Sequence, residues 1–386
     1  MNQAELLVDL RDARTVARLI ADTPPLADHL VVGTDDTGSG LGLVRWSLTG
    51  VEKAVASLRT DPATAPLVPR EPPEEDVDVL IAVLRGLARS AYGGWNPVID
   101  RDHDIGAVEL NPHVKIAVGD PAEEAAPAVV RLVGAGYPDG PRIGVADARV
   151  YDHPDLAGRY LGQPLIGPGP FLTKAPGHAT IVAGTILRRE PSARLVCRTV
   201  LVPHPDGANT SWEVANRLLA FLRDDVSVLN MSFGCLTDGS PPLALRRALD
   251  RLSGSVVLVA AAGNHGESTM PAAVYPAAFG DVTAVGAAGT DGEIAPTTPR
   301  APWLDLLAPG VDVVGPFPPA VALSADTAPT AFRSGYARWS GSSFAAANVT
   351  GAIARLIVTE RIDAFAARDR LLEEAGPDIR PFVLEV

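Results

Sequence analysis

Ser343 lies where a nucleophile would be at an advantage. Its stretch reads Gly341-Ser-Ser343-Phe-Ala-Ala-Ala-Asn348-Val-Thr-Gly351, in which small residues lead into an apolar run with helical character. A hydroxyl in the first turn of a helix lies beside unpaired backbone N–H groups and the positive end of the helix dipole, which stabilise negative charge. Such a serine can carry an oxyanion intermediate. It can equally be a helix cap, and the segment alone leaves both interpretations open.

A serine nucleophile needs a base, and the base needs a group that orients it. Upstream, His178 follows a glycine at the start of a second helix of small residues, and Asp147 ends the apolar run Arg142-Ile-Gly-Val-Ala-Asp147. Such a run is typical of a buried parallel strand, and sites in open parallel sheets lie beyond the carboxyl ends of the strands. A strand-end Asp147 can therefore meet two helix-start residues, His178 and Ser343. Taken singly, His178 can be a core or capping histidine and Asp147 a turn cap.

The order Asp147, His178, Ser343 and the residues around each resemble the triad of the subtilisin-like serine proteases, the subtilase family. Four further segments follow the family's order, namely residues 228–234, 255–264, 275–278 and 305–310. The resemblance runs from near Gly140 to the C-terminal region. It implies an α/β fold for residues 126–386, with a doubly wound, mainly parallel sheet of subtilisin type. Residues 1–125 would form an additional mixed α/β N-terminal region.

The resemblance also implies a serine endopeptidase that works through an acyl-enzyme. Ser343 would attack the peptide carbonyl, His178 would accept and return the proton, and Asp147 would hold the imidazole in the right tautomer. The side chain of Asn264, with the backbone N–H of Ser343, would form the oxyanion hole.

A peptide or protein substrate is expected to bind as an extended strand, held by main-chain hydrogen bonds and selected by side-chain pockets. The residues that correspond to the walls of the family's cleft are Ser232, Phe233 and Gly234 on one side and Ala261, Ala262 and Gly263 on the other. Phe233 and the alanines favour an apolar pocket. The alternative is that they are ordinary core residues of two strands.

The sequence departs from the family pattern close to each triad member. Ala148 and Arg149 follow the aspartate in place of a hydroxyl residue and Gly, and Ala179 follows the histidine in place of Gly. In the nucleophile segment the customary Thr, Met, Pro and His are replaced by Ser342, Phe344, Ala347 and Asn348. These changes remove no reacting atom, but they alter the packing around the site and leave the catalytic rate open.

A calcium site common in the family is expected to be missing. Asp155 matches one of its ligands, but the loop that supplies others is absent because residues 185–193 run almost directly into the next strand. Calcium takes six to eight oxygen ligands. We therefore expect no metal at this position and no cofactor for the reaction.

Composition limits the partners. The 386 residues carry a net charge of −13 and are 47% hydrophobic, so the chain can bury a large core, and its charge argues against binding nucleic acid or an anionic membrane. The first residues carry acids where a signal peptide would be apolar, and two cysteines, Cys197 and Cys235, make no disulfide framework. These features predict a cytoplasmic protein; the sequence leaves its oligomeric state open.

The N-terminal region is less informative. Helix-like spacing marks residues 4–21 and 77–91, residues 30–33 and 43–47 suggest a hairpin, and residues 62–73 suggest a linker. The run Asp100-Arg-Asp102-His103-Asp104 favours a solvated loop over a cation site. The region can be a propeptide that blocks the cleft and is removed, or a permanent domain that recruits a substrate or partner. We favour the second; a new N-terminus near residues 120–140, absent in Ser343→Ala, would favour the first.

Two other functions fit the same sequence. The chain can be an inactive subtilase fold kept as a peptide-binding scaffold, although such proteins usually lose a triad member or the oxyanion amide. It can also be a serine esterase or amidase. Covalent labelling of Ser343 separates the first alternative from a protease, and a comparison of peptide and ester turnover separates the second.

Overall fold

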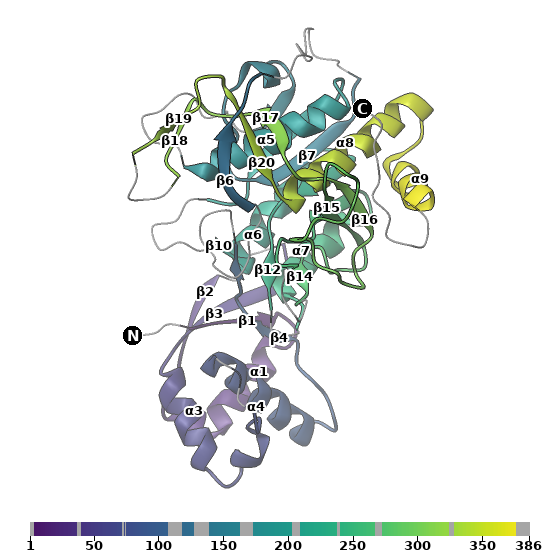
Figure 1. Ribbon diagram of the computed structural model, residues 1–386. Coiled ribbons are helices and arrows are strands. Elements are labelled where there is room, and N and C mark those ends of the chain that lie inside the picture. Colours follow the sequence, from purple (N-terminus) through teal and green to yellow (C-terminus); the bar gives the residue numbers. More distant parts are fainter. Residues whose placement is uncertain are drawn as a thin grey trace. The chain divides into compact units, whose positions relative to one another are not determined.

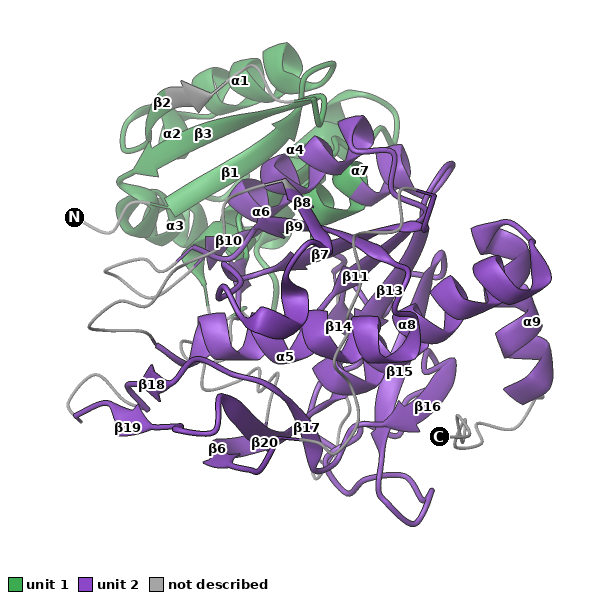
Figure 2. Ribbon diagram, turned by 90° about the horizontal axis from the view of Figure 1, so that it is seen from above, with its two compact units in different colours: residues 1–103, 242–248 green, residues 104–241, 249–386 purple. Residues whose placement is uncertain are grey.

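The computed structural model describes residues 4–36, 40–71, 73, 75–106, 118–126, 139–162, 173–202, 209–237, 240–266, 272–323 and 328–375 (Figure 1). The chain forms two compact units. Unit 1 comprises residues 1–103 and 242–248, and unit 2 comprises residues 104–241 and 249–386 (Figure 2).

Unit 1 is a small antiparallel sheet covered by helices. Its elements are β1 (Ala4–Asp9), α1 (Ala13–Asp22), α2 (Pro24–Ala27), β2 (Val31–Asp36), β3 (Leu43–Thr49), α3 (Val51–Thr60), η1 (Ala65–Leu67), α4 (Asp76–Ala91) and β4 (Ile99–Arg101). The strand order β2-β3-β1-β4, with antiparallel neighbours, is that of a ferredoxin-like split βαβ unit. A mixed α/β region was expected here, and its hairpin is confirmed as β2 and β3.

The expected helix over residues 4–21 is wrong in its first part. Residues 4–9 form β1, which pairs with β3 on one side and β4 on the other. Its Leu6, Leu7 and Val8 are all fully buried. A three-residue apolar run fits a helix face and a central strand equally well, and only the two distant strands decide between them.

Unit 2 is built on a seven-stranded sheet in the order β16-β15-β13-β11-β7-β9-β8, with every neighbouring pair parallel. Its strands are β7 (Arg142–Asp147), β8 (Tyr160–Gly162), β9 (Arg194–Thr199), β11 (Val228–Met231), β13 (Val257–Ala261), β15 (Val282–Ala288) and β16 (Leu306–Pro309). The central strands are buried along nearly their whole length, as expected when helices cover both faces. The predicted doubly wound α/β fold is confirmed.

Two long helices, α5 (Lys174–Arg189) and α8 (Ser342–Glu360), pack side by side on one face of this sheet, with α6 (Ser211–Leu218) on the other (Figures 1 and 2). The next element, η3 (Leu219–Arg223), packs on β7, since a Cβ added to Gly144 would lie 3.0 Å from the ring of Phe221. The small residues of α8 permit a close approach. A Cβ added to Gly351 would lie 2.6 Å from the Cβ of Arg189 on α5. The helix pair is thus set by residues that carry little or no side chain.

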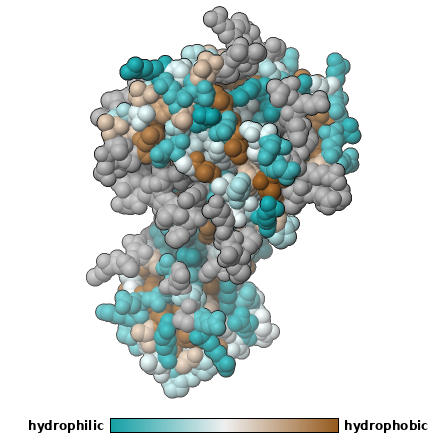
Figure 3. Space-filling model, in the orientation of Figure 1, coloured by the Kyte–Doolittle hydropathy of each residue, from teal (hydrophilic) through white to brown (hydrophobic). Residues whose placement is uncertain are grey.

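By length and composition α8 is apolar enough to cross a membrane, but 72% of its most apolar window is buried inside the protein, which is typical of a core helix. On the face shown in Figure 3, apolar residues are scattered among hydrophilic ones. The apolar character of α8 is therefore accounted for by the core.

A smaller antiparallel sheet, β17-β20-β6, lies beside α5. It is formed by β6 (Val118–Glu123), β17 (Val313–Pro316) and β20 (Tyr336–Ser340). We expected a domain boundary near residue 125, but β6 pairs with β20, and β5 (Asp104–Ile105) pairs with β10 (Asn209–Thr210). Both strands therefore belong to unit 2, and the boundary falls between residues 103 and 104.

The remaining elements are η2 (Pro154–Leu156), β12 (Cys235–Leu236), α7 (Leu243–Leu252), β14 (Val274–Tyr275), β18 (Ala320–Val321), β19 (Thr330–Ala331) and α9 (Ala364–Ala375).

Candidate active site

Asp147 and His178 meet at the carboxyl edge of the large sheet. Asp147 is the last residue of β7, and His178 lies in the first turns of α5. The Nδ1 atom of His178 lies 3.0 Å from one carboxylate oxygen of Asp147 and 3.3 Å from the other. The backbone N–H of Ala148 donates to the same carboxylate at 2.6 Å. Both side chains are buried, so the pair is shielded from solvent.

This arrangement fixes which ring nitrogen is available for chemistry. Because Nδ1 is held by Asp147, Nε2 is the nitrogen that can accept a proton. Nε2 has no hydrogen-bond partner among the residues that the structure describes. Gly177, the residue before His178, allows the start of α5 to pack closely against Phe317, since a Cβ at this position would lie 2.2 Å from the Phe317 ring.

Ser343 is the second residue of α8, and its helix begins against the same edge of the sheet. The ring of the next residue, Phe344, lies 5.3 Å from the imidazole ring of His178, measured between centroids. The start of α8 is thus beside the histidine. Ser343 is fully buried.

Asn264 is tied directly to the start of α8. Its side-chain oxygen accepts the backbone N–H of Ser342 at 2.9 Å, and the hydroxyl of Ser342 accepts the backbone N–H of Gly263 at 3.1 Å. With its oxygen engaged in this way, the NH2 group is the donor end of the Asn264 amide. The segment after β13 and the segment before Ser343 therefore hold each other in register.

A buried polar chain behind Ser343 was not anticipated from the sequence. Thr350 on α8 donates to the side-chain oxygen of Asn230 at 3.1 Å, and the amide of Asn230 donates to the hydroxyl of Ser232 at 2.9 Å. That hydroxyl donates to the backbone carbonyl of Ser343 at 3.4 Å. The signal that could have revealed it is Asn230 itself, because a polar residue in a fully buried strand must be hydrogen-bonded.

The wall formed by Ser232, Phe233 and Gly234 pairs with a segment of the chain itself. The backbone N–H of Gly106 donates to the carbonyl of Gly234 at 2.9 Å in an antiparallel bridge. One residue earlier, β5 pairs antiparallel with β10, Ile105 opposite Asn209. Residues 104–106 therefore lie as an extended strand along the edge expected to bind substrate, and Ile105 is only 2% exposed.

The other expected wall is in large part core. Ala261 belongs to the main apolar core of unit 2, and Ala262 packs against Leu304 and Leu307. Phe233 is also fully buried. These side chains are buried, and Gly263, with φ +96°, shapes the turn before Asn264. The substrate role of this wall stays a prediction.

Asn348, which stands where the family has histidine, joins three elements. Its side-chain oxygen accepts Nε of Arg189 on α5 at 2.8 Å, and its NH2 group donates to the carbonyls of Pro309 at 2.8 Å and Phe344 at 3.2 Å. The departure therefore gives α8 a link to α5 and to the end of β16. Among the other positions that depart from the family pattern, Ala148, Ala179 and Ala347 are buried, whereas Arg149 is exposed to solvent.

Asp155, which matches a family calcium ligand, is held by protein groups. The hydroxyl of Tyr336 lies 2.9 and 3.1 Å from its two carboxylate oxygens. Burial, together with that hydrogen bond and the charge of Asp155, raises the pKa of Tyr336 to about 12. No group of three or more His, Cys, Asp or Glu side chains gathers anywhere in the described residues. The expected absence of a metal here stays a prediction.

Cys197, on β9 beside the strand that ends in Asp147, is unreactive as a thiol. Burial raises the pKa of the Cys197 thiol on β9 to about 12, and the charge of Asp147 acts in the same direction. The reactive thiolate is therefore suppressed. Cys197 and Cys235 are both free and buried.

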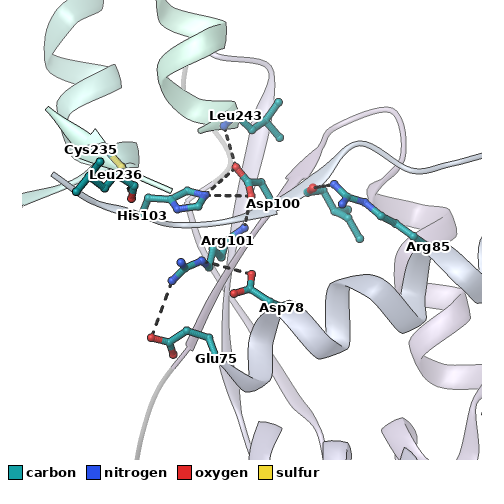
Figure 4. A network of polar contacts seen from close by, with 10 residues as sticks. Glu75, Asp78, Arg85, Asp100, Arg101, His103, Cys235, Leu236 and Leu243 are labelled. Atoms are coloured by element: carbon teal, nitrogen blue, oxygen red, sulfur yellow. Dashed lines mark hydrogen bonds and ion pairs between the residues drawn. The ribbon is translucent and has the colours of Figure 1, made fainter. Parts of the chain in front are cut away.

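In unit 1 the part of the acidic motif that lies in and just after β4 is structural (Figure 4). Nε2 of His103 lies 3.2 Å from both carboxylate oxygens of Asp100, and Asp100 also accepts the backbone N–H of Leu243 at 2.8 Å. Arg101 pairs with Asp78 at 3.3 Å. The expected solvated loop is wrong for Asp100 and His103, which are buried.

Comparison with known proteins agrees with this architecture. The sequence pattern of the subtilase family matches residues 138–369. Subtilisin BL from Lederbergia lenta is 33% identical over 234 residues, which cover 58% of this chain and 77% of that protein. A thermostable alkaline protease from Halalkalibacterium halodurans is 32% identical over 228 residues, 56% of this chain. The chain spans 60% of the length of that second relative.

Two solved structures share the fold. Fervidolysin from Fervidobacterium pennivorans, a keratinolytic enzyme related to subtilisin, matches with a TM-score of 0.60 at 17% identity, over 96% of this chain and 57% of that one. A lanthipeptide protease matches with a TM-score of 0.51 at 23% identity, over 63% of this chain and 82% of that one. At these identities the likeness concerns the fold alone.

Proposed function

The chain belongs to the subtilase family of serine endopeptidases, and on that premise we propose that it hydrolyses peptide bonds with Asp147, His178 and Ser343 as its catalytic groups. The observation that carries the proposal is the buried contact between Asp147 and Nδ1 of His178, beside the helix start that bears Ser343. A carboxylate on Nδ1 sets the tautomer that a general base requires and stabilises the imidazolium that forms.

In this mechanism Nε2 of His178 takes the proton of the Ser343 hydroxyl as the oxygen attacks the substrate carbonyl. Hydrogen bonds between such groups are often long without substrate, so an unoccupied Nε2 is compatible with the role. The side chain of Asn264 and the backbone N–H of Ser343 stabilise the oxyanion. His178 then gives its proton to the leaving amine, and water hydrolyses the acyl-enzyme in the second half of the reaction.

The substrate of this proposal is a peptide bound as an added strand between β10 and Gly234. Residues 104–106 occupy that place in the chain itself, through Ile105 opposite Asn209 and Gly106 opposite Gly234. A free peptide must therefore displace this segment. Of the two roles considered for the N-terminal region, this observation favours one that blocks the cleft over recruitment.

We include an intracellular processing or regulatory role in the proposal. Both cysteines are free and buried, as is usual for proteins of reducing compartments. A cleft covered by the chain's own segment would restrain such a protease until a substrate or a cut removes it.

Steady-state hydrolysis of a fluorogenic peptide tests the proposal, with Ser343→Ala, His178→Ala and Asp147→Asn as variants and the corresponding ester as a second substrate. We expect peptide turnover in the parent and a loss of several decades in each variant, about 10⁴-fold for Asp147→Asn by the precedent of the serine protease triad. Ester turnover alone would identify an esterase. Binding of peptides without turnover of either substrate would identify a scaffold.

A further inference from the structure

The imidazole of His178 is held by aromatic rings as well as by Asp147. The indole of Trp339 lies 5.9 Å from it, with 89° between the ring planes, and the ring of Phe344 lies at 5.3 Å and 46°. Trp339 and Phe344 also contact each other at 6.0 Å. All three side chains are at most 2% exposed. The orientation of the imidazole therefore depends on where the indole lies.

Trp339 in turn is fixed by β6. Its indole N–H donates to the backbone carbonyl of Gly119 at 3.0 Å. Pairing between β6 and β20 is irregular at this point, since Ala122 lies opposite Arg338 and Val118 opposite Ser340. Between these two pairs, β6 therefore advances by four residues while β20 advances by two. Such a bulge turns backbone groups away from the regular ladder, and here it accompanies the Gly119 carbonyl that meets the indole.

Glycine is needed at this position for its backbone conformation. Gly119 has φ +68°, in the left-handed region that other residues adopt at a cost. A Cβ added there would meet no atom within 4 Å, so a substitution would act through backbone strain alone. Gly119 can therefore be altered without a steric clash.

A second contact joins β6 to the histidine's helix. Asp120 pairs with Lys174, the first residue of α5, at 2.5 Å. The Asp120 side chain is 58% exposed, so solvent weakens this pair. The Trp339 side chain, which joins Gly119 to His178, is itself buried, although the Gly119 backbone that it binds is exposed.

We propose that Trp339 is a positioning residue for the reaction, and that β6 sets its place through the Gly119 carbonyl. The proposal rests on the protease function proposed above. Loss of the N–H bond lets the indole tilt against Phe317, which packs on it at 6.4 Å. The imidazole then loses its alignment while Asp147 still holds Nδ1. Misalignment of about 1 Å between reacting groups lowers turnover by about 10²-fold.

The first test is a double-mutant cycle with Trp339→Phe, which keeps a ring but removes the N–H, and Gly119→Ala. Turnover is normalised to active sites titrated with a fluorophosphonate, so that misfolded protein does not count. We expect each single variant to lower kcat by about 10²-fold with KM nearly unchanged. The double variant should be little worse than either, because both changes break one connection. Parental kcat in either single variant, or additive losses, would overturn the proposal.

Matched controls exist for both changes. Trp303→Phe makes the same substitution in a half-buried ring of unit 2, and no ring contact between Trp303 and His178 occurs in the described part of the chain. Gly158→Ala strains another left-handed glycine, with φ +74° and nothing within 4 Å of the added Cβ. Both controls should keep the parental kcat.

A second readout does not depend on activity. In protein labelled with ¹⁵N-histidine, Gly119→Ala should shift the ring resonances of His178, although Trp339 remains in the chain, and Gly158→Ala should leave them in place. Unshifted resonances in Gly119→Ala would overturn the link from β6 to the histidine. An inactive parent would overturn the protease function instead, and these spectra would still decide whether β6 positions the ring.

Discussion

The side-chain oxygen of Asn264 accepts the backbone N–H of Ser342, 2.9 Å away, one residue before Ser343. This bond occupies the acceptor end of the amide, and it ties the proposed oxyanion donor to α8, the helix that bears Ser343. One contact thus fixes Asn264 relative to the first turn of α8, where both groups of the proposed oxyanion hole lie.

Asn264→Ala is expected to lower kcat by about 10²–10³ with little change in KM, a loss of the size known for the corresponding donor in subtilisin. The donor acts on the oxyanion and not on the bound peptide, which is why KM is spared. Steady-state kinetics of the variant provides the measurement. The variant also loses the hydrogen bond from Ser342, which can lower stability. Thermal unfolding of the variant is therefore measured together with its kinetics. Unchanged turnover in a folded variant would remove Asn264 from the mechanism.

The strand formed by residues 104–106 leads to a prediction about processing. Gly106 is the last described residue paired at the substrate edge, and Val118 is the first residue of β6, which pairs with β20. We expect purified active protein to acquire a new N-terminus within residues 107–117, earlier than the range 120–140 considered from the sequence, because β6 is part of unit 2. Intact mass spectrometry with N-terminal sequencing reports the cut.

The control is Ser343→Ala, which should stay intact when purified alone. Mixing it with active enzyme then separates cleavage within one chain from cleavage between chains. If the active protein keeps its full length while hydrolysing peptides, residues 1–106 are a permanent part of the enzyme.

Tyr336 predicts an alkaline limit to stability. Its pKa is raised to about 12 by burial, by the hydrogen bond to Asp155 and by that residue's charge, against about 10 in an unfolded chain. The neutral phenol is favoured by folding, so its contribution is complete below pH 10 and is lost as the pH rises from 10 to 12. Tyr336→Phe should be less stable than the parent by about 1 kcal/mol at pH 8, and this gap should close towards pH 12.

Denaturant unfolding at several pH values measures the gap. Tyr92→Phe, which changes a ring that is 47% exposed, is the matched control and should show no gap at any pH. A difference between the parent and Tyr336→Phe that stays constant up to pH 12 would refute the assignment.

Asn348→Ala tests whether the departure from the family histidine has a structural use. The change leaves Nε of Arg189 and the carbonyl of Pro309 without the partners that Asn348 supplies. We expect the free energy of unfolding to fall by about 1–3 kcal/mol. Thr359→Ala, on the exposed end of the same helix, is the control. If the two changes lowered the free energy of unfolding equally, the link between α5 and α8 would contribute nothing to stability.

Local sequence was enough to predict the elements that carry the proposed triad. An apolar run ending in Asp147 is a strand end, and small residues after His178 and Ser343 belong to closely packed helices. Each of these patterns lies within a few helical turns or within one strand, so neighbouring residues are enough to recognise it. The doubly wound fold was predicted from the resemblance to the subtilase family, and the seven-stranded parallel sheet confirms it.

What the sequence could not show depends on partners far along the chain. Asp100 looked like part of a solvated loop, but it accepts the N–H of Leu243, 143 residues later. Trp339 is held by Gly119, 220 residues earlier. Ile105 gave no sign that it would lie along the substrate edge, because its partner, Asn209, is set by the fold. No periodicity within one segment reports such pairs.

The most direct test of the account is covalent labelling of the folded protein by a fluorophosphonate, followed by peptide mapping. The reagent phosphonylates only a serine whose proton is removed by a base. We predict a single adduct on Ser343, formed by the parent and absent from His178→Ala. Folded parent protein that remains unlabelled, or that is labelled equally well without His178, would contradict the claim that these residues form one catalytic unit.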